Sequence, residues 1–338
     1  MCKLKTQPRR WNLVVVAFGL LCLYGCQQQD EAHTVQIDGT RFIGSQTPGG
    51  EVVSFLGVPF AQPPVATLRW ELPKPWVSEK PLYPATEFSP ACMQGPYLSN
   101  WYKGVIADFG ADPEIFIAPQ ESEDCLYLNV WRPSPIATAP LPVVVFIHGG
   151  SNKGGWSFEP NYQGEKLSQK GVVVVTIAYR LGVFGFFSHP QMGDANFGLY
   201  DQIAALEWVQ ENIHAFGGDA SNVTVMGESA GANNIDYLLV SPLAKDLFSK
   251  VIHQSGGSSL TNRSIRQEHL KRGAALSLQL LGGNVDDPIN QLRSFSADDI
   301  LAATATVYSG HYFDPVIDGS SVPITVVDAV RGNKMHPV

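Results

Sequence analysis

One stretch decides the fold, and it reads Val223-Thr224-Val225-Met226-Gly227-Glu228-Ser229-Ala230-Gly231. Its first four residues are β-prone and predict a strand, and the residues after the serine predict a helix. A glycine stands two positions from the serine on each side, because a strand-to-helix turn this tight admits only very small residues there. Such a turn leaves the serine hydroxyl exposed above the sheet, so the stretch predicts a nucleophilic serine.

A second motif lies upstream, where His148-Gly149-Gly150-Ser151 follows the apolar run Leu141 to Ile147. Acyl transfer through serine needs donors for a tetrahedral oxyanion as well as a base held by an acid. Small residues after a strand let backbone N–H groups approach the substrate carbonyl oxygen. A glycine turn that merely ends a strand is the alternative, but the order of the two motifs favours catalysis. The predicted oxyanion donors are Gly149, Gly150, Ser151 and Ala230.

Strand and helix patterns alternate along the chain. They predict an α/β fold with a mainly parallel central sheet and helices on both faces. Almost unbroken apolar runs suit central strands that are buried on both faces. The expected strands are Glu51 to Val58, Cys125 to Trp131, Leu141 to Ile147, Val172 to Ile177, Val223 to Met226 and Lys250 to His253. The expected helices cover Leu199 to Ile213, Ala230 to Ser241 and Ile265 to Leu281.

The composition suits a globular domain, since 44% of the 338 residues are hydrophobic and 16% are charged. The formal net charge of −8 leaves no basic surface for nucleic acid. No metal-ligand cluster and no phosphate-binding loop stands out, so neither a metal nor a cofactor is expected. The expected partner is a small-molecule substrate.

The first residues read as an export signal. A basic start and an apolar stretch predict a signal peptide over residues 1–25, and Cys26 follows in a context that resembles a bacterial lipobox. Residues 26–34 form a polar tether, and residues 35–338 carry the α/β pattern. An ordinary cleaved signal peptide with a chance cysteine is the alternative. We therefore expect an exported protein in the periplasm or at the cell surface, with a lipid anchor at Cys26 as its only membrane contact.

Two cysteines lie beyond the leader, Cys92 and Cys125. An exported chain with two remaining cysteines most simply pairs them. In the chain-entropy model a disulfide that closes just over thirty residues stabilises the fold by roughly 3–4 kcal/mol.

Further stretches resemble the type-B carboxylesterase family, which includes the cholinesterases and bacterial para-nitrobenzyl esterases. The resemblance covers about residue 35 to the last residue and implies an α/β-hydrolase fold. The matching stretches begin with Phe55 to Pro64, Leu68 to Trp70 and Glu123 to Val130. They continue with Ala178 to Gly182, Gly185 to Phe187, Asn196 to Gln202, Ala205 to Gln210, Phe216 to Asp219, Ile252 to Gly256 and Pro315 to Gly319.

The resemblance implies hydrolysis of carboxylic esters through an acyl-serine intermediate at Ser229. It implies a disulfide from Cys125 back to Cys92, and oxyanion donors at Gly150, Ser151 and Ala230. Ser151 stands where many members have glycine, which leaves the backbone N–H in place.

In the family the acid and the histidine of the catalytic triad come later in the chain than the motifs matched above, and neither can be assigned to a residue of this sequence. Residues 334–338 resemble the start of the strand that leads to the acid. We therefore expect the chain to be the N-terminal portion of a longer esterase with its C-terminal part missing, and the strand at Lys250 to His253 to be an open sheet edge.

Three alternatives stay open. A local triad could use His336 with Asp314, Asp318 or Asp328. A second possibility is a non-catalytic, cholinesterase-like binding module, although such relatives commonly lack the serine that this chain keeps. The third is an inactive truncated product.

Overall fold

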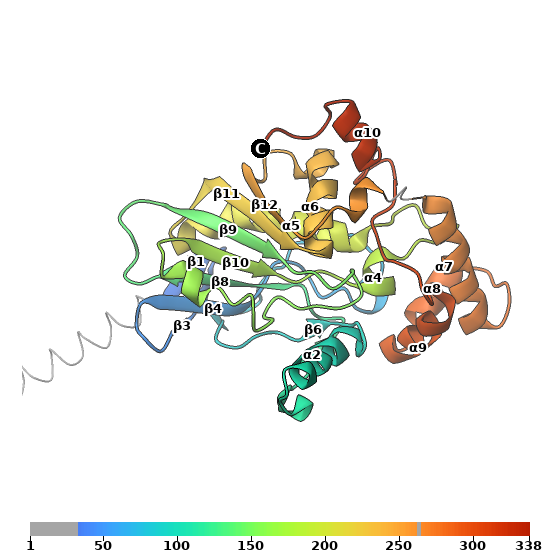
Figure 1. Cartoon of the computed structure of the whole chain (residues 1–338), viewed down its shortest axis with the longest axis horizontal. Coiled ribbons are helices and arrows are strands. Elements are labelled where there is room, and N and C mark those ends of the chain that lie inside the picture. Colours follow the sequence, from blue (N-terminus) through green and yellow to red (C-terminus); the bar gives the residue numbers. More distant parts are fainter. Residues whose placement is uncertain (1–32, 262–264) are drawn as a thin grey trace, which may run out of the picture.

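A seven-stranded sheet forms the centre of the protein, which we describe from a computed structural model covering residues 33–261 and 265–338 (Figure 1). Its strand order is β12-β11-β9-β10-β8-β4-β3. These strands are β3 (Ser45–Gln46), β4 (Val52–Pro59), β8 (Tyr127–Pro133), β9 (Leu141–Ile147), β10 (Val173–Ile177), β11 (Gly218–Glu228) and β12 (Lys250–Gln254). A small three-stranded sheet contains β1 (Thr34–Ile37), β2 (Thr40–Ile43) and β5 (Leu82–Pro84). A two-stranded sheet contains β6 (Ala91–Cys92) and β7 (Glu121–Ser122).

The central sheet is mixed. Strands β12, β11, β9 and β10 run parallel to one another, whereas the pairs β10–β8, β8–β4 and β4–β3 are antiparallel. The expectation of a mainly parallel sheet therefore holds for the half that carries Ser229. The sequence does not reveal the antiparallel direction of the strands in the other half, because a strand buried on both faces shows the same apolar run in either direction.

Helices cover the two faces of the sheet. Val173 and Val175 of β10 face the main core, which also contains side chains of α5 and α6, whereas Val174 faces the opposite side with Trp131, next to α3. The helices are α2 (Tyr97–Asp108), α3 (Glu165–Ser168), α4 (Gly182–Phe186), α5 (Phe197–Asn212), α6 (Ala230–Val240), α7 (Arg266–Leu281), α8 (Pro288–Arg293), α9 (Ala297–Val307) and α10 (Val326–Arg331).

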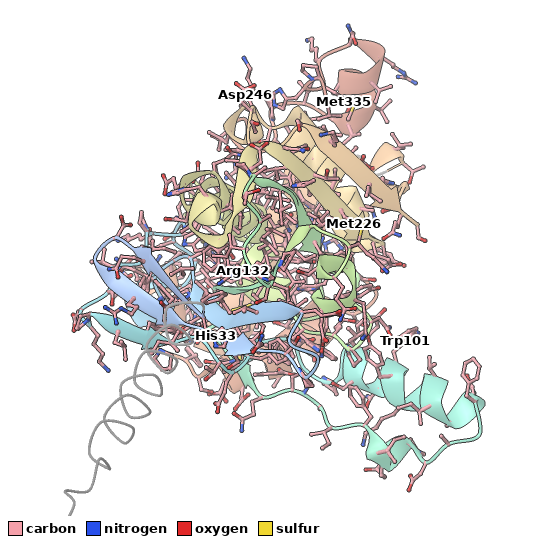
Figure 2. All side chains as sticks on the ribbon, turned by 90° about the vertical axis from the view of Figure 1, so that its left-hand side faces the viewer. His33, Trp101, Arg132, Met226, Asp246 and Met335 are labelled. Carbon is pink, nitrogen blue, oxygen red and sulfur yellow. A yellow bond between two sulfur atoms is a disulfide. The ribbon has the colours of Figure 1, made fainter. Side chains whose placement is uncertain are left out.

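The helix α2 projects from the body of the molecule (Figures 1 and 2). Leu98 and Tyr102 hold it through a small cluster with Trp156 that is separate from the main core, whereas Trp101 is 54% exposed. A disulfide between Cys92 and Cys125 closes the segment that contains this helix.

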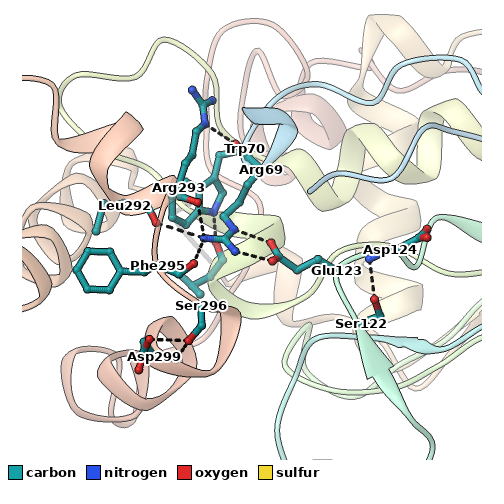
Figure 3. A network of polar contacts seen from close by, with 11 residues as sticks. Arg69, Trp70, Ser122, Glu123, Asp124, Leu292, Arg293, Phe295, Ser296 and Asp299 are labelled. Carbon is teal, nitrogen blue, oxygen red and sulfur yellow. Dashed lines mark hydrogen bonds and ion pairs between the residues drawn. The ribbon is translucent and has the colours of Figure 1, made fainter. Parts of the chain in front are cut away.

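Arg69 joins three parts of the chain (Figure 3). Its Nε and Nη2 atoms donate to the two carboxylate oxygens of Glu123 at 2.6 and 2.5 Å. Its Nη1 atom donates to the backbone carbonyls of Leu292, Arg293 and Phe295, which lie at the end of α8. The segment next to the disulfide and the helical α8–α9 region are therefore fixed to one buried guanidinium.

Strand β12 lies at the edge of the sheet, as expected, and pairs with β11 alone among the described strands. Ile252 on this strand is 43% exposed. The predicted signal peptide and Cys26 lie outside the described residues. Within the residues described, no helix is both long and apolar enough to cross a membrane.

Candidate active site

Ser229 occupies the turn between β11 and α6. Its backbone has φ 52° and ψ −117°, and its N–H donates to the carbonyl of Gln254 at 2.9 Å. A Cβ atom on Gly227 would lie 2.6 Å from the carbonyl carbon of Gly231, and one on Gly231 would lie 2.1 Å from the carbonyl oxygen of Ile147. Glycine at both positions is therefore a steric requirement, and the strained φ of the serine is held by the surrounding backbone.

The loop after β9 lies directly against this turn. A Cβ atom on Gly149 would lie 3.1 Å from the Cβ atom of Ser229 and 2.8 Å from the carbonyl oxygen of Glu228. The backbone N–H groups of Gly149, Gly150 and Ser151 donate to no acceptor among the described residues. Free N–H groups beside a nucleophile can stabilise a developing oxyanion. The structure thus brings the loop and Ser229 together, and Ala230 follows as the first residue of α6.

Buried side chains brace this loop from behind. The Tyr179 hydroxyl lies 3.0 Å from the His148 carbonyl oxygen and 3.2 Å from Asn152 Oδ1. Asn152 donates to the Phe313 carbonyl at 2.8 Å and accepts from Asn234 of α6 at 3.0 Å. The sequence did not point to these bracing roles, since only the fold brings residues so far apart in the chain into contact.

His148 is itself part of the brace. Its ring stacks on Tyr179 with centroids 4.5 Å apart, and its Nδ1 lies 2.9 Å from the Gly149 carbonyl oxygen. Burial lowers the pKa of His148 to about 4, so its imidazole is neutral at pH 7. A buried, neutral imidazole that stacks on Tyr179 and contacts Gly149 suits support of the loop rather than proton transfer at Ser229.

A pocket of about 270 Å³ opens between this loop and α2. Ser229, Glu228, Glu159 and Tyr102 are among the residues that line it. Glu159 accepts from the Tyr102 hydroxyl at 2.6 Å, and burial raises the pKa of its carboxyl group. Burial also raises the pKa of Glu228. Glu159 lies in no sequence motif, and its place in the pocket lining depends on the fold, which brings it against Tyr102 of α2.

No hydrogen bond joins the Ser229 hydroxyl to a histidine among the described residues. His253 instead lies 3.3 Å from Asp236. His336 Nε2 contacts the carbonyl of Ser241 at 2.5 Å, at the opposite end of α6 from Ser229. Since α6 has eleven residues, about 16 Å separates its two ends. A local triad built on His336 is therefore wrong.

Cys92 and Cys125 are bonded in the structure and join the start and end of the α2 segment. Among the described residues, no group of three or more histidine, cysteine, aspartate or glutamate side chains could hold a metal ion.

The Carboxylesterase family matches residues 30–337. The para-nitrobenzyl esterase of Bacillus subtilis (strain 168) is 40% identical over 304 residues, which are 86% of this chain and 58% of that protein. The fumonisin B1 esterase of Sphingopyxis macrogoltabida is 42% identical over 218 residues, which are 62% of this chain and 37% of that protein. Acetylcholinesterase of Electrophorus electricus is 37% identical, over 86% of this chain and 46% of its own length.

A solved structure of PNB esterase matches with a TM-score of 0.78 at 36% sequence identity, covering 90% of this chain and 61% of that one. The chain thus spans less than two thirds of the length of each of these relatives. The sheet, the helices on its faces and these matches confirm the resemblance seen in the sequence motifs. The chain belongs to the carboxylesterase family and has an α/β-hydrolase fold.

Proposed function

We propose that this chain hydrolyses carboxylic esters of small molecules through an acyl-serine intermediate at Ser229. The observation that carries the proposal is the close approach of Gly149 to Ser229, together with the N–H groups of Gly149, Gly150 and Ser151, which donate to no acceptor among the described residues. The names of the matched relatives, which are esterases, support the same reaction type.

In this proposal the Ser229 oxygen attacks the ester carbonyl carbon and passes its proton to a base. The carbonyl oxygen becomes an oxyanion that the N–H groups of Gly150, Ser151 and Ala230 hold. Removing one such donor costs roughly 3–4 kcal/mol of transition-state stabilisation. The oxyanion then collapses, the C–O bond to the alcohol breaks, and the base returns the proton to the leaving oxygen. Water repeats the cycle on the acyl-serine and releases the acid.

We propose that the base and its acid partner come from outside the described residues. The support is that His148 and His253 are engaged elsewhere and His336 lies at the far end of α6. No histidine base lies beside Ser229 among the described residues, and this keeps a second candidate function in view. In that alternative the chain is a cholinesterase-like binding module, or an inactive product, which retains the turn at Ser229 but does not hydrolyse an ester.

A fluorophosphonate probe tests the nucleophile. Labelling of the wild type that is lost in Ser229→Ala and kept in Ser255→Ala supports the proposal. Ser255 is a matched control because it, like Ser229, stands at positive φ directly after a strand of the central sheet. Equal labelling of Ser229→Ala would contradict it.

Chemical rescue tests the missing base. If no base faces Ser229, millimolar imidazole should accelerate Ser229-dependent hydrolysis of a 4-nitrophenyl ester, since a free imidazole then takes the serine proton. Fast hydrolysis that does not respond to imidazole would show that a base is already present. Labelling and hydrolysis that are both absent, with imidazole as without it, would favour the binding module.

We further propose that the protein is exported and lipid-anchored at Cys26. The support is the signal-peptide pattern of residues 1–25 and the polar tether that follows. In a bacterial host, metabolic labelling with palmitate should mark the wild type and not Cys26→Ser. Labelling of both proteins, or of neither, would contradict the anchor.

A further inference from the structure

Gln94 contacts the end of the loop that begins at His148, although it lies more than fifty residues upstream. Its Oε1 accepts from the Gly155 N–H at 2.8 Å, and its Nε2 donates to the Gly155 carbonyl at 2.9 Å. The same Nε2 donates to the Cys92 carbonyl at 3.0 Å. One amide group therefore binds both backbone groups of Gly155 and ties them to the disulfide-bonded segment.

Gly155 matters because its backbone packs against the start of the loop. It stands at φ +123°, and a Cβ atom there would lie 2.2 Å from His148 Nδ1 and 2.8 Å from the Gly149 carbonyl oxygen. Between the two ends, the N–H groups of Lys153 and Gly154 both donate to the Gly150 carbonyl, at 3.0 and 3.1 Å. The loop is thus a closed turn, and a group that fixes Gly155 also restricts Gly149, Gly150 and Ser151, which line the same pocket as Ser229.

The segment that carries Gln94 is itself held in place. Glu121 Oε2 accepts from the backbone N–H groups of Gln94 and Gly95 at 3.1 and 3.0 Å. Cys92 pairs with Ser122 between β6 and β7 and is bonded to Cys125. Gln94 therefore acts from a rigid base, which is what an amide needs if it is to restrict a glycine-rich loop.

We infer that Gln94 is a positioning residue that holds the Gly149–Gly155 loop in the shape in which its free N–H groups face Ser229. Gln94 itself does not contact Ser229 in the described hydrogen bonds, so its effect passes through Gly155. The kinetic part of this inference rests on the proposed ester hydrolysis. The structural part does not, because the shape of the loop can be measured without turnover.

Two variants separate the bonds. Gln94→Leu removes all three hydrogen bonds, and Gln94→Glu keeps the oxygen that accepts from Gly155 while losing both donated bonds. Gln46→Leu is the control, because Gln46 also bonds one backbone carbonyl, that of Gly50 at 2.8 Å, in an exposed turn after β3. The structural measurement is hydrogen exchange of the intact protein, read out on its peptides by mass spectrometry, and it does not require an active serine.

We expect exchange in the peptide covering residues 148–156 to be about tenfold faster in Gln94→Leu, as for loss of about 1.4 kcal/mol of local stability. Exchange in β11 should stay unchanged, and Gln46→Leu should match the wild type in both peptides. Unchanged exchange over 148–156 in Gln94→Leu overturns the inference. If that variant loosens throughout, Gln94→Glu decides the matter, because a local change confined to 148–156 supports positioning and an unchanged loop overturns it.

Kinetics give a readout that a merely structural role would not move. Loss of loop order should lower kcat for a 4-nitrophenyl ester by about tenfold to a hundredfold, since only the transition state uses the oxyanion donors, and should leave KM within about threefold. Gln94→Glu should lower kcat at least as much as Gln94→Leu, because its second carboxylate oxygen would face the carbonyl oxygens of Gly155 and Cys92. A raised KM with unchanged kcat overturns the inference. A wild type without Ser229-dependent hydrolysis contradicts the proposed function instead, and hydrogen exchange then still decides whether Gln94 positions the loop.

Discussion

Single residues in unusual backbone conformations build this site. Ser229 stands at φ 52°, and Ser151 and Asn152 stand at φ 59° and 52° in the loop that faces it. For a residue other than glycine this left-handed region is strained by roughly 1–2 kcal/mol. Asn152 is compensated by its buried hydrogen bonds to Phe313 and Asn234. No side-chain hydrogen bond of Ser151 offsets its strain among the described contacts.

Replacing Ser151 with glycine should therefore relieve strain without removing the backbone N–H. Part of the gain is cancelled, because glycine has more freedom in the unfolded chain. We expect Ser151→Gly to change the free energy of unfolding by between zero and about 1 kcal/mol in the stabilising direction. Urea denaturation measures it, with Ser151→Ala as the control that keeps the strain. A variant that is clearly less stable than wild type would show that the Ser151 side chain is needed.

Elements are joined by a small number of buried charges. Arg69 and Glu123 keep 6% and 14% of their side-chain surface exposed, and the guanidinium also binds three carbonyls near α8. In the main core, Arg180 and Asp201 form a second pair at 2.7 Å with 3% and 0% exposed. Removing one partner of such a pair leaves a buried charge uncompensated, which is more costly than the net value of the pair itself.

Arg69→Met should therefore destabilise the fold by about 3–5 kcal/mol, because Glu123 and three carbonyls lose their donor. The matched control is Lys103→Met, since Lys103 pairs with Glu114 at 3.0 Å near the surface, where the Lys103 side chain is 34% and the Glu114 side chain 74% exposed. That change should cost less than about 1 kcal/mol. Chemical denaturation of both variants provides the test, and equal losses would argue against a special role for Arg69.

Across the whole molecule, buried titratable groups couple stability to pH. The pKa values of His148, His269 and His311 are lowered to about 4, mainly by burial, and the charge of Arg272 contributes to the lowering at the last two. The unfolded chain takes up these protons near pH 6.5, whereas the folded chain does not until about pH 4. The stability from keeping them neutral is therefore present above pH 6.5 and is lost as the pH falls toward 4.

His148→Gln should flatten this pH dependence, because glutamine takes up no proton. For fully buried His148, the wild type should lose about 3 kcal/mol more unfolding free energy than the variant between pH 6.5 and pH 4. Urea denaturation at several pH values in that window measures it. The raised pKa of Glu159 acts with the opposite sign, so the comparison of variant with wild type is the measure, rather than the wild-type curve alone. Parallel curves for the two proteins would contradict the prediction.

The sequence by itself determined the elements around Ser229 and the family. Residues 223–231 predicted the strand, the tight turn and the helix around Ser229, and the apolar runs predicted β9 and β10 to within a residue at either end. These features are local, because steric limits on small residues and burial of continuous apolar strands act within a few positions of the chain. Family membership followed from the motifs and was confirmed over residues 30–337.

Only the tertiary structure decided what supports the site. The direction of β8 and β4, the bracing of the loop by Tyr179 and Asn152, and the binding of Gly155 by Gln94 all join residues far apart in sequence. Each depends on where the fold places two distant segments. The hydrogen-bond partner of an amide or a hydroxyl group cannot be predicted from the residues next to it in the sequence. The structure also excluded His336 as the local base, because the length of α6 separates it from Ser229.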